Sequence, residues 1–151
     1  LMPRDEVDPT TGKKGEWSMS AAVNEKHLGM LQGVITRMAG NSFLLKGWSV
    51  TLVSALLALA ANRADWLLVA VALLPALTFW GLDGYFLAQE RLFRRIYERV
   101  VAGDQTVPTY GLNPGPCGIG CWWASVTSPT LVWFHGVIVL VIVLILGYLG
   151  I

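Results

Sequence analysis

Three blocks of apolar residues dominate the chain, and they predict helices that cross a membrane. The blocks cover residues 43–61, 66–82 and 131–151. Each is close to the roughly 20 residues that an α-helix needs to cross a hydrocarbon core about 30 Å thick. The third block includes the unbroken Val, Ile and Leu run at 137–146. A lone strand of this length would leave its backbone unpaired in lipid, so we expect a third helix.

Amphipathic helices are predicted to extend the first two spans into water. Apolar residues recur at helical spacing from Ser20 to Ala39, and charged residues occupy the other faces. Gly40-Asn41-Ser42 predicts a helix end and a new cap, although the helix could also run straight through. Beyond Asp83 the second span continues with one apolar and one charged face until Gly103.

The remaining segments are predicted to be irregular. Residues 1–17 mix charges with Pro and Gly, which is typical of a flexible arm. Residues 62–65 form a tight polar turn between the first two spans. The segment 102–130 is rich in Gly and Pro and reads as a long loop, whose Trp122-Trp123 pair we expect at the membrane interface. The expected division is therefore a 1–17 arm, an 18–101 two-span unit, a 102–130 loop and a 131–151 span.

Composition supports the membrane assignment. Hydrophobic residues make up 54% of the 151-residue chain and charged residues only 14%. A soluble domain of this size rarely has such a composition. The formal net charge of +1 is too small to indicate a polyanion partner. The sequence therefore predicts an all-α integral membrane protein whose solvent is the lipid bilayer.

The placement of basic residues predicts the orientation. Only one of the 11 basic residues, Arg63, lies in the turn between the first two spans. The others lie before or at the start of the first span or follow the second: Arg4, Lys13, Lys14, Lys26, Arg37, Lys46, Arg91, Arg94, Arg95 and Arg99. The positive-inside rule then places the N-terminus and the long loop in the cytoplasm and the C-terminus outside.

A cluster of cations in the expected cytoplasmic extension is a candidate binding site for an anionic ligand. Guanidinium groups match phosphate oxygens in geometry, so a nucleotide is a natural candidate. The alternative is that these side chains only fix topology and contact anionic lipid headgroups. The residues are Arg91, Arg94, Arg95, Arg99, Lys26 and His27.

Polar residues at the cytoplasmic end of the first span are candidates to line a pore in an oligomer. Asn41, Ser42, Lys46 and Ser49 follow one helical row, and charges inside a bilayer usually face protein or water. The alternative is that Lys46 pairs with Asp83 and anchors the hairpin of the first two spans. His135 could respond to protons, or it could be an interfacial or hydrogen-bonded residue.

A row of small residues on the first span predicts close packing between helices. Gly47, Thr51, Ser54 and Ala58 are spaced three or four residues apart and lie roughly on one side of the helix. Such stripes let helix backbones approach each other in lipid. Three helices cannot enclose a pore alone, so we expect a homo-oligomer.

The sequence shows no recognisable enzyme site. It contains neither a nucleophile, base and orienting residue at catalytic spacing nor a metal-ligand pattern, so we expect no enzyme activity, no metal and no cofactor. Cys117 and Cys121 could form a redox pair, but in a cytoplasmic loop we expect unpaired thiols.

Two stretches of the chain carry a family resemblance: RMAGNSFLLKGWSVTLVSALLALA at 37–60 and FWGLDGYFLAQERLFRRIYERV at 79–100. Together they resemble the SLATT family, which comprises two-span membrane effectors of bacterial anti-phage defence. The resemblance covers about residues 20–101. The long loop and the third span depart from the family's plain two-span layout.

The resemblance implies a function for the chain. The expected protein is a pore-forming effector in the bacterial inner membrane that assembles as a homo-oligomer, with a tetramer as the working size. Its cytoplasmic face would be gated by a nucleotide or oligonucleotide from a partner nucleotidyltransferase, and its open state would depolarise the membrane. The rival interpretation is a non-conducting anchor or interaction module for a soluble defence enzyme.

Overall fold

The computed structural model describes residues 9–63 and 66–149, and within this part all regular structure is helical. Five helices follow one another: α1 Pro9–Arg63, α2 Trp66–Val71, α3 Leu73–Val101, α4 Ile119–Val126 and α5 Pro129–Tyr148. Residues 1–8 of the expected arm, residues 64–65 of the turn and the last two residues lie outside the described residues. The all-helical prediction is confirmed.

Three segments are long and apolar enough to cross a membrane, as the sequence predicted. They are Ala21–Asn62, Trp66–Val101 and Pro129–Tyr148. The 20 residues of α5 rise about 30 Å at 1.5 Å per residue, which matches a hydrocarbon core. The chain is therefore a multi-pass membrane protein.

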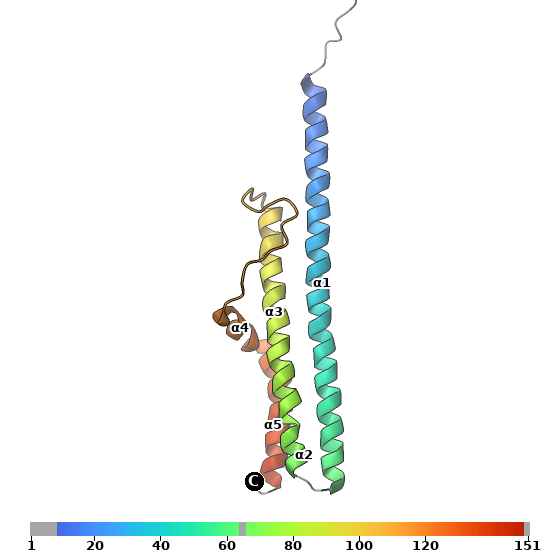
Figure 1. The fold of residues 1–151 in the computed structure, drawn as a ribbon, viewed down its shortest axis with the longest axis vertical. Helices are drawn as coiled ribbons and strands as arrows, with labels where there is room; N and C mark the ends of the chain where they lie inside the picture. Colours follow the sequence, from blue (N-terminus) through green and yellow to red (C-terminus); the bar gives the residue numbers. More distant parts are fainter. Residues whose placement is uncertain (1–8, 64–65, 150–151) are drawn as a thin grey trace, which may run out of the picture.

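The second span is divided into α2 and α3 by a break at Ala72. Pro75 has no N–H and cannot donate to the carbonyl one turn before it, so the regular ladder is interrupted here. The N–H of Ala72 donates to both Leu68 and Val69 carbonyls, at 3.3 and 3.2 Å. The span thus continues in nearly the same direction with a local change in geometry (Figure 1).

Helix α1 corrects two predictions made from the sequence. It runs through Gly40-Asn41-Ser42 without a stop, so the continuous alternative is the correct one. It also begins at Pro9, so residues 9–17 are helical instead of irregular. Its 55 residues correspond to about 82 Å of helix, far more than the bilayer needs. Figure 1 shows its N-terminal part extending beyond the end of α3.

The helices bury two apolar layers with a polar layer between them. The first layer joins α1, α2, α3 and α5 through Val53, Ala60, Val69, Ala72, Ala76 and Ile142. The second layer joins the extensions of α1 and α3 beyond the spans through Leu31, Phe93, Ile96 and Val100. The amphipathic character predicted for both extensions is confirmed by this second layer. The polar layer contains the buried side chains of Ser49, Asp83 and His135.

The long loop is more ordered than the sequence predicted. It returns from the end of α3 along the extensions and then forms the eight-residue helix α4 beside α3 (Figure 1). Helix α4 was not predicted because the residues directly before it include Pro114, Gly115, Pro116 and Gly118. Such a frequency of Gly and Pro is typical of irregular chain. The prediction of an irregular 102–130 loop is therefore wrong for Ile119–Val126.

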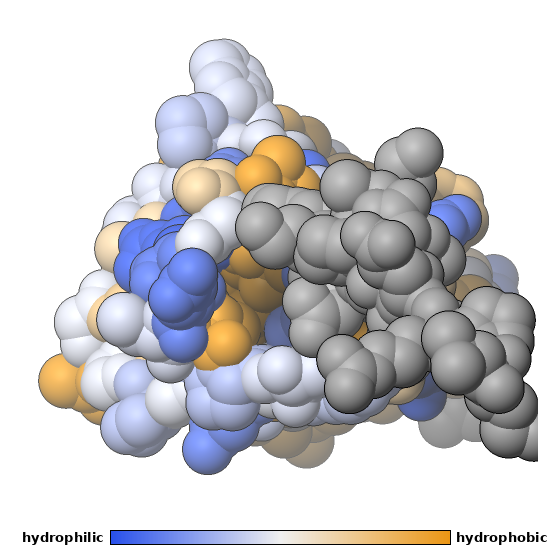
Figure 2. All heavy atoms as spheres, turned by 90° about the horizontal axis from the view of Figure 1, so that it is seen from above, coloured by the Kyte–Doolittle hydropathy of each residue, from blue (hydrophilic) through white to orange (hydrophobic). Residues whose placement is uncertain are grey.

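The end of the bundle that carries the N-terminal part of α1 is polar. Figure 2 looks onto this end and shows hydrophilic residues in blue around smaller hydrophobic areas in orange. In contrast, large apolar side chains are exposed along the spans, such as Phe43, Trp133 and Leu144. This distribution fits helices whose lower parts face lipid and whose upper parts face water.

Candidate functional site

A buried carboxylate connects all three spans. Asp83 of α3 is fully buried, and its side chain accepts hydrogen bonds from both neighbouring spans. Its Oδ2 lies 2.5 Å from Lys46 Nζ of α1 and 3.0 Å from His135 Nε2 of α5, and its Oδ1 accepts the hydroxyl of Ser42. We call Ser42, Lys46, Asp83 and His135 the polar cluster.

The polar cluster confirms the pairing alternative for Lys46. Lys46 also donates to Ser42 Oγ at 2.9 Å, and its ammonium group lies 5.9 Å from the centre of the Phe134 ring. With three donors directed at one carboxylate, Asp83 is stabilised in its ionised form by hydrogen bonds as well as by charge. The pair therefore links α1 to α3 at the level where α5 also contacts them.

His135 is buried and hydrogen-bonded, as one of its two predicted roles required; the other was a response to protons. Its ring stacks on Trp80, with 6.0 Å between the ring centres and an angle of 12°. Its Nε2 faces Asp83, while its Nδ1 is buried and has no hydrogen-bond partner among the described residues. With Nε2–H donating to the carboxylate, Nδ1 is left as a buried hydrogen-bond acceptor.

The polar cluster lies within the apolar band, nearer its cytoplasmic end in the expected orientation. His135 follows Pro129 by six residues, or about 9 Å of helix, and about 20 Å of α5 remains beyond it. An isolated charge at the bilayer centre costs about 2.5 to 3.5 kcal/mol by insertion scales. Pairing within the cluster offsets this cost, and it explains why Lys46 and Asp83 occur together in otherwise apolar spans.

The structure directs most of the predicted pore row toward the chain's own interior. Ser42 and Lys46 belong to the polar cluster, and Ser49 is fully buried with no hydrogen-bond partner in the described part of the chain. Asn41 is half-buried. Ser42 and Lys46 thus face α3, and the pore-lining role of the four residues stays a prediction.

Helix α4 is held against α3 directly beside the polar cluster. Trp122 Nε1 donates to the Gly81 carbonyl and Trp80 Nε1 donates to the Val126 carbonyl, both at 3.1 Å. A Cβ atom at Gly84 would lie 2.3 Å from Val126 Cγ2, so only glycine permits this close approach. This contact was not predicted from the sequence, which suggested only a membrane-interface position for the Trp122-Trp123 pair.

Arg91 secures the far end of the same contact. It donates to the Ala124 carbonyl at 3.2 Å and to Ser125 Oγ at 3.3 Å. These groups lie in the last turn of α4, where helix carbonyls carry partial negative charge and favour a cation. Arg91 is therefore a structural partner of α4.

The other predicted ligand cations differ in the partners that they already have. Arg94 pairs with Glu90 at 2.7 Å, and Arg99 pairs with Asp104 at 2.8 Å and also donates to Thr106. Arg95 and Lys26 are exposed and make no hydrogen bond or ion pair to another described residue. Of the predicted cations, these two alone are not already engaged within the part of the chain that the structure describes.

Asp104 is held ionised by the start of the loop. Hydrogen bonds from Thr106, followed by the Arg99 guanidinium, lower the pKa of Asp104 to about 2. Because this pKa is depressed, the link between α3 and the loop is fully present above about pH 4 and is lost as the pH falls toward 2. The link therefore persists across the physiological range.

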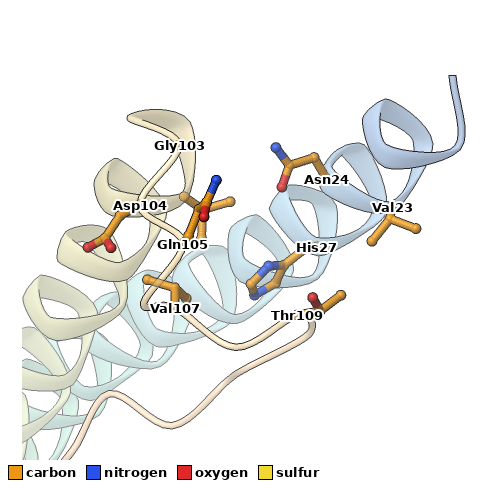
Figure 3. A pocket seen from close by; sticks show the side chains of 9 residues that line it. Val23, Asn24, His27, Gly103, Asp104, Gln105, Val107 and Thr109 are labelled. Atoms are coloured by element: carbon orange, nitrogen blue, oxygen red, sulfur yellow. The ribbon is translucent and has the colours of Figure 1, made fainter. Parts of the chain in front are cut away.

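His27 ties the loop to α1. Its side chain is buried and its Nε2 lies 3.0 Å from the Gly111 carbonyl, so Nε2 donates and Nδ1 is left as an acceptor. A cavity of about 360 Å³ adjoins it, between α1, the end of α3 and the loop. Figure 3 shows Asn24, His27, Gln105 and Thr109 around this cavity. Nothing in the sequence pattern marked this cavity.

The small-residue stripe predicted on α1 is exposed and longer than expected. Gly47, Thr51, Ser54 and Ala58 all lie on the surface of the chain. The same surface continues with glycines spaced seven residues apart, at Gly33, Gly40 and Gly47, and no atom lies within 4 Å of a Cβ built at any of them. Ser54 and Ala61 extend this spacing and are also exposed.

The two cysteines are joined, contrary to the expectation of free thiols. Cys117 and Cys121 form a disulfide with a Cα–Cα distance of 5.6 Å, within the usual range for such a bond. Cys117 lies one residue before Gly118, the N-cap of α4, and Cys121 lies in the first turn of the helix, so the start of α4 holds the two side chains close together. An irregular loop would not have fixed them in this way.

Comparison with protein-family models, with curated proteins and with solved structures gives no match to this chain. The resemblance to the SLATT family therefore stays a prediction that rests on the residues quoted above.

Proposed function

We propose that the chain is the subunit of an oligomeric membrane channel, which is gated through its cytoplasmic extension. The polar cluster is the observation that carries this proposal. Ionisable residues inside membrane spans usually mark ion or proton pathways, or the elements that control them. Here a Lys, an Asp and a His from three different spans meet at one point, so any relative movement of the spans must rearrange them.

The exposed stripe on α1 supports assembly. A strict seven-residue repeat of small side chains is the pattern of a helix seam in a left-handed coiled coil, where backbones approach closely. From Gly33 to Ala61 the stripe covers about 42 Å of helix. A homo-oligomer would pack the α1 helices of its subunits along this seam. The angle between neighbouring α1 helices would set the number of subunits, and we keep a tetramer as the working size.

The continuous rods of α1 and α3 support gating from the cytoplasm. Each joins a membrane span to an aqueous extension without a flexible linker, so a ligand that favours one arrangement of the extensions also favours one arrangement of the spans. Following the family resemblance, we propose a nucleotide or oligonucleotide signal from a partner nucleotidyltransferase, in bacterial anti-phage defence at the inner membrane. In the proposed orientation the N-terminus and the loop are cytoplasmic and the C-terminus lies outside.

Arg95 is the residue we expect to matter most for this signal. Arg94 already pairs with Glu90, while Arg95 makes no such pair within the described residues. Arg95→Glu should therefore weaken binding of a fluorescent oligonucleotide to the protein in nanodiscs by tenfold or more, and Arg94→Glu should weaken it less. Equal binding by both variants and the wild type would show that these arginines only fix topology.

An ion-flux assay separates the channel from a non-conducting anchor. Purified protein in phosphatidylcholine and phosphatidylglycerol vesicles with a potassium gradient should dissipate an imposed potential, followed with a voltage-sensitive dye. Gly47→Leu should reduce both the oligomer mass in detergent and the flux severalfold, because leucine blocks close approach of backbones.

The matched control is Leu52→Phe, an exposed position on α1 about 140° around the helix from Gly47, which should leave mass and flux unchanged. Wild-type vesicles that hold their potential, although the protein is inserted and oligomeric, would favour the anchor for a soluble defence enzyme. Unchanged mass and flux in Gly47→Leu would show that the stripe faces lipid.

A further inference from the structure

We propose that Cys117 and Cys121 form a reversible redox site, whose state controls how α4 is held against α3 beside the polar cluster. Part of this inference rests on the proposed function, because it uses the proposed cytoplasmic orientation of the loop. The contacts that carry it are independent of conduction.

The disulfide closes the beginning of α4. Cys117 precedes Gly118, the N-cap residue, and Cys121 lies in the first turn of the helix. The Gly118 carbonyl accepts the N–H groups of Cys121 and Trp122 at 3.0 and 3.3 Å. Both cysteines are half-buried, so a reductant can reach the bond. The covalent link therefore fixes the same turn whose next residue, Trp122, anchors α4 to α3.

Helix α4 has little stability of its own. It contains eight residues, and isolated helices of this length are marginal in water. Its position depends on the disulfide at one end and on its contacts with Gly81, Gly84 and Arg91 of α3. Opening the disulfide removes one of these constraints and leaves the first turn free to fray.

The position of α4 affects the polar cluster through two short connections. Gly81 and Gly84, which α4 contacts, flank Asp83 on α3. In the other direction, only Thr127 and Ser128 separate α4 from Pro129, where α5 begins, and α5 carries His135. Trp80 of α3 contacts both α4 and α5, because it donates to the Val126 carbonyl and stacks on His135. Release of α4 would therefore change the support of both Asp83 and His135.

Whether the Cys117–Cys121 disulfide persists depends on the redox state of the compartment that contains it. In the proposed orientation this loop faces the cytoplasm, where disulfides are usually transient and serve catalysis or sensing. Reduction by a dithiol, such as a thioredoxin-type protein, breaks the Cys117–Cys121 S–S bond. Two electrons and two protons pass to the two sulfur atoms, and the dithiol becomes a disulfide. Another protein disulfide, as the oxidant, reverses the step by the same exchange.

Thiol accessibility and tryptophan emission test the inference without any assay of conduction. Purified protein in nanodiscs would be equilibrated in dithiothreitol buffers of graded potential, and its free thiols counted by the mass added by maleimide. We expect reduction to add two labels and to shift the emission of the tryptophans as Trp80 and Trp122 lose their contacts. Cys117→Ser/Cys121→Ser should show the reduced emission at all potentials.

Two outcomes would overturn the inference. Reduction that leaves the emission and the protease resistance of α4 unchanged would show that the bond does not control this helix. Maleimide that labels reduced cysteines of intact cells from the outer side would place the loop in an oxidising compartment, where the bond is a permanent structural link. Potassium flux measured in the same preparations would show separately whether the proposed channel function fails.

Discussion

Asp83→Leu should be the most damaging single substitution in the chain, with a loss of about 3 to 5 kcal/mol in the free energy of unfolding. Asp83 is the common acceptor of Ser42, Lys46 and His135, and its removal leaves the Lys46 charge within the apolar band without a partner. Unfolding in mixed detergent micelles, followed by circular dichroism, measures the effect.

Two companion variants separate lost pairing from lost packing. Lys46→Met should cost less than Asp83→Leu, because Asp83 keeps His135 and Ser42 as partners. The double variant Asp83→Leu/Lys46→Met should recover part of the loss, since no unpaired charge remains, although His135 still lacks its acceptor. Additive losses in the double variant would show that the two side chains do not interact.

Gly84→Ala should have the second largest effect, about 1 to 3 kcal/mol, by overpacking the contact between α3 and α4. The added Cβ would lie 2.3 Å from Val126 Cγ2 and 3.2 Å from Val126 Cα, so the helices must separate. Limited proteolysis before α4 and the same unfolding measurement would detect this. We expect faster cleavage because the released α4 frays.

Gly81→Ala is the matched control, because it makes the same change three residues earlier on the same helix. The nearest atom to its Cβ would be Trp122 Cζ2 at 3.6 Å, which is an ordinary contact. It should be neutral or stabilising by up to about 1 kcal/mol, since alanine favours helix over glycine. Val126→Ala should partly rescue Gly84→Ala. Equal effects of the two alanines would contradict the close approach at Gly84.

The three spans and the Lys46–Asp83 pair could be predicted from the sequence because they depend on the length of apolar segments and on the need of charges in lipid for partners. Apolar length alone predicts the three crossings. The charges of Lys46 and Asp83 in apolar segments require partners, and the hairpin brings them to the same level. The pairing of Lys46 with Asp83 was one of the alternatives predicted from the sequence. His135 was not included in this pair, although it is an isolated ionisable residue in the third span.

The features that were missed depend on contacts between distant segments. Helix α4 forms among residues that disfavour helices, because α3 provides partners for Trp122 and Val126. The arginines of the α3 extension looked alike in sequence, yet Arg91, Arg94 and Arg99 have different structural partners. Gly40 resembles a helix stop in sequence, but α1 is unbroken there and Gly40 lies on its exposed row of small residues.

A planar-bilayer recording of the purified wild-type protein tests the central claim most directly. The oligomeric channel predicts discrete current steps of uniform size, which appear at protein amounts where cross-linking detects oligomers and which are lost in Gly47→Leu. A bilayer that stays electrically silent, while the same preparation contains inserted and cross-linked oligomers, would contradict the account.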